Sequence, residues 1–110
     1  MKVVNLTPHD VVVRLTGRDV VFPRSGQQAR VAVTQTEVAV IDSIPVVRNV
    51  YGEVQGLPAP ERGTIYIVSA QVLERAGGRH DVFAPDTSPA GVVRDAEGRI
   101  IAVKRLVAAP

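Results

Sequence analysis

The chain has 110 residues, which suits one domain, and 45% of them are hydrophobic, enough for a folded core. It has no cysteine, which excludes disulfides, thiolate chemistry and cysteine-ligated zinc. The net charge is +2, but the basic residues are spread along the chain, so we do not expect nucleic-acid binding. No apolar run approaches the roughly 20 residues that span a bilayer, so we expect no membrane contact and a cytoplasmic location.

Valine-rich runs separated by turn residues predict a mostly β fold of the α+β class. Valine is stiff about χ1 and fits a pleated sheet better than a helix. Aromatic residues make up only 4% of the chain, so the core has to be aliphatic. We therefore expect a single domain over residues 1–110, with antiparallel hairpins in a small sheet or barrel-like domain and one short helix.

In the first half of the chain, each apolar run ends at a group of turn residues. The expected elements are a strand over 2–6, a turn over 7–10, a hairpin of 10–15 with 19–22, a strand over 29–33, and a second hairpin of 37–41 with 44–50. The second hairpin turns at Asp42 and Ser43. A proline-rich loop over 57–63 follows, too short to link two domains.

In the second half, residues 64–68 form the strongest candidate for a buried strand. Ser69 follows as an expected N-cap of a helix near residues 69–76, and two glycines end that helix. A short strand over 81–84 comes next. The last expected hairpin joins 91–95 to 99–107 through residues 96–98.

The segment over residues 85–89 is the most function-like loop, because two prolines restrict a carboxylate and two hydroxyls. We expect Asp86, Thr87 and Ser88 to bind a ligand. Arginines on neighbouring strands would offer charge to a phosphate group of that ligand; the candidates are Arg94, Arg48 and Arg30. In the alternative interpretation, Asp86 caps its own turn and the arginines are solvated surface.

Two other positions carry alternative interpretations. His9 is either a ligand contact or base, or part of a turn in which neighbouring polar side chains bind the local backbone. Ser69 is either a nucleophile between a strand and a helix, or only the helix N-cap. His9 and His80 lie far apart in sequence without close ligand spacing, so we expect no metal site and no cofactor.

Six short segments occur in one order along nearly the whole chain. They are residues 5–9 (NLTPH), 51–54 (YGEV), 63–70 (GTIYIVSA), 85–87 (PDT), 93–95 (VRD) and 104–106 (KRL). In these segments the chain resembles a family of small uncharacterised proteins of bacteriophages, prophages and bacteria, many of them actinobacterial. The resemblance implies a phage or prophage context, and hence the cytoplasm of a bacterial host. It implies no residue roles.

Three functions follow as hypotheses. The first is a homo-oligomeric, phage-type protein that binds a nucleotide-like molecule without catalysis. By analogy with phage proteins of this size, the molecule would be a phosphate-bearing signal of host immunity such as a cyclic nucleotide. The second is a small enzyme acting on a nucleotide or related metabolite, which needs His9, His80, Asp81 or Asp86 brought together. The third is a structural or host-factor interaction protein that binds through a sheet edge.

Overall fold

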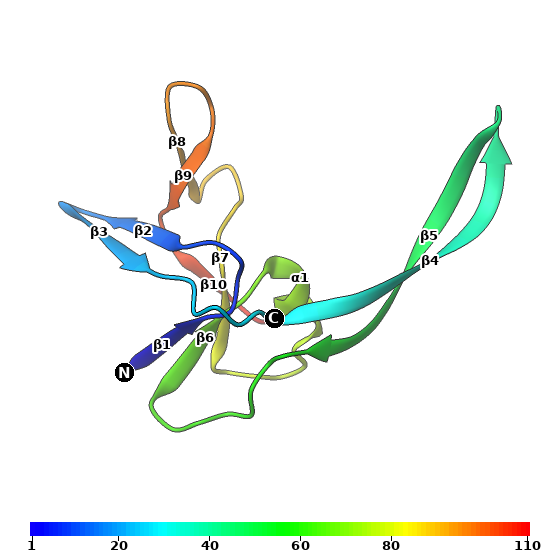
Figure 1. Cartoon of the computed structure of the whole chain (residues 1–110). Helices are drawn as coiled ribbons and strands as arrows, with labels where there is room; N and C mark the ends of the chain where they lie inside the picture. Colours follow the sequence, from blue (N-terminus) through cyan, green and yellow to red (C-terminus); the bar gives the residue numbers. More distant parts are fainter.

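The computed structural model describes all 110 residues and consists of ten strands and one short helix (Figure 1). The mostly β class with one short helix is thus confirmed. The elements are β1 (Lys2–Asn5), β2 (Val11–Leu15), β3 (Arg18–Phe22), β4 (Arg30–Ile41), β5 (Ile44–Gln55), β6 (Thr64–Ile67), α1 (Ala70–Arg75), β7 (Val82–Pro85), β8 (Val92–Arg94), β9 (Ile100–Val103) and β10 (Leu106–Ala108). They form three open sheets, so the barrel-like alternative is not the observed arrangement.

The first sheet has the order β1-β6-β7-β10 and contains parallel strands. β1 pairs in parallel with β6, with Lys2 opposite Thr64, and β6 pairs in parallel with β7. Only β10 runs antiparallel to its neighbour β7. The expectation of antiparallel hairpins misses these parallel pairs, because an apolar run reveals that a strand is buried but not which distant strand lies beside it.

The second sheet has the order β3-β2-β9-β8. It contains two of the predicted hairpins, β2 with β3 and β8 with β9, joined by a parallel contact of Val13 with Val103. The expected strand over 99–107 is divided, since β9 ends at Val103 and β10 begins at Leu106. At this break the chain leaves the second sheet and enters the first.

The helix α1 begins where the sequence predicts. Ser69 has an extended backbone, and its hydroxyl oxygen accepts a hydrogen bond from the Val72 N–H at 3.3 Å, so Ser69 is the N-cap. Val72 and Leu73 are the buried residues of the helix. They join the larger core cluster, which contains Leu6, Ala29, Val31, Tyr66, Val68, Val72, Leu73, Val82 and Ala84.

The strands β4 and β5 form a long two-stranded hairpin that projects from the body of the molecule (Figure 1). We call residues 30–55 the arm. The expected strands over 29–33 and 37–41 are one continuous strand here, β4. The turn at Asp42 and Ser43 is confirmed, and both residues have positive φ, 49° and 66°, as in the tight turns that suit the twist of hairpins.

The single helix is short, and no helix of the protein is long and apolar enough to cross a membrane.

Candidate functional site

The buried side chain of Asn5 organises the loop between β1 and β2. Its amide nitrogen donates hydrogen bonds to the carbonyl oxygens of His9 and Phe22, both at 2.9 Å. Its oxygen accepts from the N–H and from the hydroxyl of Thr7, at 2.9 and 2.7 Å. Asn5 is only 1% exposed, so these four bonds satisfy a polar group that water cannot reach.

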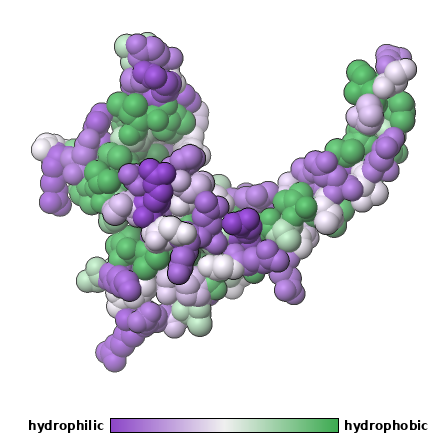
Figure 2. Space-filling view, viewed as in Figure 1, coloured by the Kyte–Doolittle hydropathy of each residue, from purple (hydrophilic) through white to green (hydrophobic).

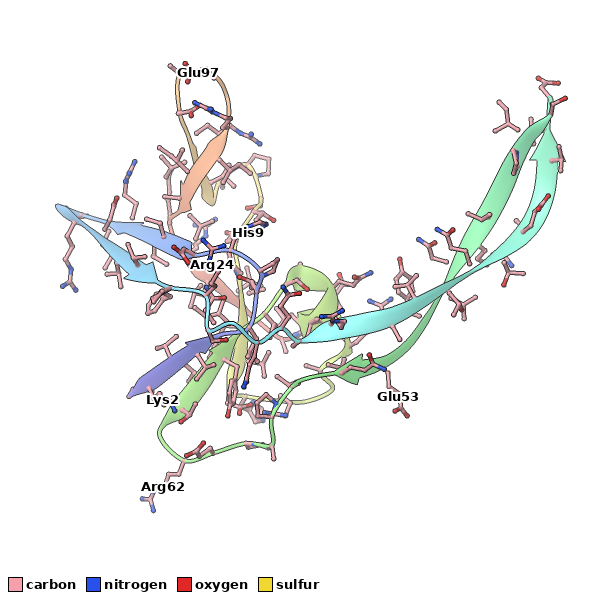
Figure 3. The ribbon with its side chains drawn as sticks, in the orientation of Figure 1. Lys2, His9, Arg24, Glu53, Arg62 and Glu97 are labelled. Atoms are coloured by element: carbon pink, nitrogen blue, oxygen red, sulfur yellow. The ribbon has the colours of Figure 1, made fainter.

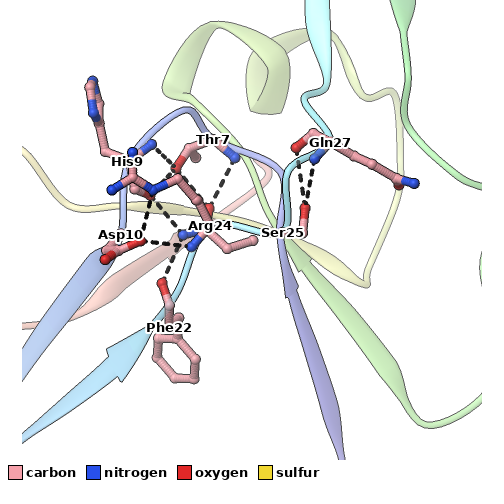
Figure 4. A network of polar contacts seen from close by, with 8 residues as sticks. Thr7, His9, Asp10, Phe22, Arg24, Ser25 and Gln27 are labelled. Atoms are coloured by element: carbon pink, nitrogen blue, oxygen red, sulfur yellow. Dashed lines mark hydrogen bonds and ion pairs between the residues drawn. The ribbon is translucent and has the colours of Figure 1, made fainter.

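His9 lies at the outer side of this loop, on the body and away from the arm (Figure 3). Its backbone is fixed from both sides, since its carbonyl oxygen accepts from the Asn5 amide at 2.9 Å and its N–H donates to the Thr7 hydroxyl oxygen at 3.4 Å. Its imidazole ring is exposed and points away from the hydrogen-bond network (Figure 4). The loop thus presents the ring of His9 on a rigid backbone.

Asp10 is held by the segment that follows β3. One of its carboxylate oxygens accepts from the Arg24 backbone N–H at 2.9 Å and from the Arg24 guanidinium at 3.2 Å (Figure 4). The backbone hydrogen bond from Arg24 is the largest cause that lowers the pKa of Asp10 below its usual value. Asp10 is therefore a paired, ionised carboxylate and a poor proton acceptor.

A cleft of about 450 Å³ opens beside His9, and we call it the His9 cleft. Its residues come from both four-stranded sheets, the β1–β2 loop and the start of α1: Thr7, Pro8, His9, Asp10, Val11, Val12, Ser69, Ala70, Pro85, Thr87, Ile100, Ile101, Ala102 and Val103. The β2 and β9 residues of the lining are apolar, and the polar residues of the lining are Thr7, His9, Asp10, Ser69 and Thr87. This volume and this mixture are typical of small-molecule sites.

The Asp86 side chain has structural partners on both carboxylate oxygens. One oxygen accepts from the Ser88 backbone N–H at 3.0 Å, and the other accepts from the Arg105 guanidinium at 2.6 Å. Hydrogen bonding to Ser88 and then to Arg105 lowers the pKa of Asp86 to about 2. Asp86 is 8% exposed, and it fixes the loop at the point where the chain crosses between the two sheets.

Gly91 is the glycine that this arrangement requires. A Cβ atom added at Gly91 would overlap the carboxylate and the carbonyl oxygen of Asp86. The Gly91 carbonyl also accepts from the Lys104 N–H at 2.7 Å, which ties the loop to the crossing. The sequence marks Arg105 as a charge of the last hairpin, either paired at the surface or an anion contact, but it predicts neither its pairing with Asp86 nor the position of Gly91 against that carboxylate. A proline-bounded loop with an aspartate signals a turn, but not its distant partners.

The predicted site residues do not all meet in one place. His9 and Thr87 both line the His9 cleft. Asp86, Thr87 and Ser88 line a second, adjacent pocket of about 380 Å³ beside α1 and β10. The arginines line neither of these pockets: Arg30 and Arg48 lie on the arm, and Arg94 donates to the Gly98 carbonyl within its own hairpin at 2.7 Å.

Comparison of the chain with protein-family models, with curated proteins and with solved structures found no match.

Proposed function

We propose that the protein binds a small molecule in the His9 cleft without transforming it. The observation that carries the proposal is that two predicted ligand contacts, His9 and Thr87, line one cleft together with apolar residues of β2 and β9. The cleft volume of about 450 Å³ falls in the range of roughly 300–1,000 Å³ that small-molecule sites occupy.

The lining of the cleft favours a flat ligand with a few hydrogen-bonding groups at its edge, such as a nucleoside or a cyclic nucleotide. Ile100 and Ile101 are nearly half exposed and offer apolar surface to a base. The hydroxyls of Thr87 and Ser69 and the imidazole of His9 are positioned to bind polar edges. No arginine lines the cleft, so any phosphate group would have to lie at its open side, with His9 as the nearest predicted contact.

Two observations support binding over catalysis. Hydrogen bonds from Arg24 lower the pKa of Asp10, so its carboxylate is a weak base beside His9. The Ser69 hydroxyl accepts a hydrogen bond from the helix N-terminus, which is its structural role. In the phage context that the sequence resemblance implies, the molecule bound would be a nucleotide signal of the host, removed from solution by sequestration.

The test is retention of ligand by the purified protein. The protein is incubated with a panel of nucleosides, nucleotides and cyclic nucleotides, freed of unbound ligand, denatured, and the released molecules are identified by mass spectrometry. Intact ligand supports the proposal. Recovery of an altered ligand would show an enzyme, and retention of no member of the panel would refute nucleoside or nucleotide binding.

A pair of variants locates the site. Ile101→Asp places a charge on the lining of the cleft and should abolish retention of the ligand. Val21→Asp places the same charge on β3, at a side chain of similar exposure that does not line the cleft, and should leave retention unchanged. Equal retention by both variants would show that the ligand does not bind in the His9 cleft.

A further inference from the structure

The arm carries most of the exposed large hydrophobic residues of the chain. Fourteen large hydrophobic residues of the chain are exposed, and eight of them are on the arm: Val33, Val38, Val40, Ile41, Ile44, Val47, Val50 and Tyr51. The other six are divided among the N-terminus and the strands of the body. Figure 2 shows hydrophobic side chains along the arm as far as its tip.

The arm is anchored to the body only at its base. Val31 is buried there in the core cluster and Val54 packs against the same cluster. Arg75 of α1 lies over the Tyr51 ring, 4.0 Å from its centroid. Beyond these residues the arm is two strands with no covering layer, and an isolated two-stranded hairpin is at best marginally stable in water.

The accessible surface of the chain is larger than a folded monomer of its mass requires. The surface measures 7516 Å², whereas a monomer of 11.7 kDa is expected to expose about 5,900 Å². The radius of gyration is 16.6 Å against about 13 Å expected for this length. The excess surface, about 1,600 Å² for each copy, is what one copy buries in an obligate homodimer, where the two copies together bury roughly 2,000–5,000 Å².

From these observations we infer that the arm is an interface for a second copy of this chain. A two-fold interface brings the same surface of both copies together, and the arm carries most of the exposed large hydrophobic residues. The inference does not depend on the binding of a ligand in the His9 cleft.

The experiment measures mass by light scattering on the purified wild-type protein and two variants. The wild type should be a dimer at micromolar concentration. Val50→Lys changes an exposed side chain in the middle of the arm, so it should yield a monomer near 11.7 kDa whose circular dichroism is still rich in strand. Val21→Lys is the matched control on β3, 53% exposed against 48% for Val50, and should remain a dimer.

A monomeric wild type, or a Val50→Lys variant that stays dimeric, would overturn the arm interface. Loss of the dimer in both variants alike would also overturn it, because the effect would then not be specific to the arm.

Discussion

The side-chain oxygen of Asn5 accepts two hydrogen bonds from Thr7, one from its backbone N–H at 2.9 Å and one from its hydroxyl at 2.7 Å. The amide nitrogen of Asn5 donates to two carbonyl oxygens on either side, those of His9 and Phe22. One buried amide therefore joins the end of β1, the β1–β2 loop and the end of β3.

Asn5→Ala should lower the free energy of unfolding by at least about 2 kcal/mol, because each buried polar group left without a partner costs roughly 1–3 kcal/mol. Denaturant unfolding followed by circular dichroism measures the change. Gln71→Ala, which removes an exposed amide on α1, should change the free energy by less than about 0.5 kcal/mol. Similar values for the two variants would contradict the structural role of Asn5.

Acid should destabilise the protein in part through Asp86. Its pKa is about 2 in the folded chain against an ordinary value of 3.8, so its contribution to stability is present above about pH 4. The contribution is lost as pH falls from about 4 toward 2, when the carboxylate takes up a proton and its bonds to Ser88 and Arg105 weaken. The measurement is Tm as a function of pH.

Asp86→Asn isolates this contribution, since the pKa values of Asp10, Asp19, Asp81 and Asp95 are also lowered and their protonation in acid contributes as well. The variant should have a lower Tm at pH 7 and a smaller loss of Tm between pH 4 and pH 2. Glu61→Gln changes an exposed carboxylate without an ion pair, and its curve should run parallel to that of the wild type. If Tm of the Asp86→Asn variant falls between pH 4 and pH 2 as steeply as that of the wild type, the Asp86 carboxylate does not contribute to the acid sensitivity of the protein.

Gly91→Ala should destabilise the loop at the crossing between the sheets. The new methyl group would overlap the Asp86 carboxylate, and overpacking of this kind costs about 1–3 kcal/mol. Thermal unfolding measures it. Gly52→Ala is the control, because its Cβ would meet Ala32 Cβ at 3.3 Å, a tight contact that a small shift can relieve. If Gly91→Ala lowers Tm no more than Gly52→Ala does, the loop shifts to accommodate the new methyl group.

Substitution of Ser69 distinguishes its role as the helix N-cap from a role as a nucleophile. Ser69→Ala removes the acceptor for the Val72 N–H and should cost about 1 kcal/mol. Ser69→Asp supplies another capping oxygen and should keep most of the wild-type stability. If both variants retain wild-type Tm, the hydroxyl does not stabilise the helix, and its place on the border of the His9 cleft becomes its main property.

Sequence patterns predict the local elements of this protein well, because local signals determine them. The valine runs, the Asp42–Ser43 turn and the Ser69 cap each act over a few residues, and all three are confirmed. The parallel neighbours of β6 are not predictable in this way. β1 pairs with β6 although β2, β3 and the whole arm lie between them in the sequence.

The candidate site shows the same division. The restricted loop over residues 85–89 is visible in the sequence, but the partner of Asp86 is Arg105, nineteen residues away, at a crossing that reads as one continuous strand. The uncovered state of the arm is likewise not visible in the sequence. Alternating residues indicate a strand, but they do not show whether a second layer covers it.

The parallel pairing in the body has a consequence for the order of folding. The arm closes through contacts between residues near in sequence, with Ile41 opposite Ile44 at its turn. The body joins Lys2 to Thr64, and Val13 to Val103, so neither sheet can close until most of the chain has been synthesised. Long loops have to be ordered before these contacts form, which makes such folding slow. The body should therefore set the folding rate, while the arm is free to form its hairpin early.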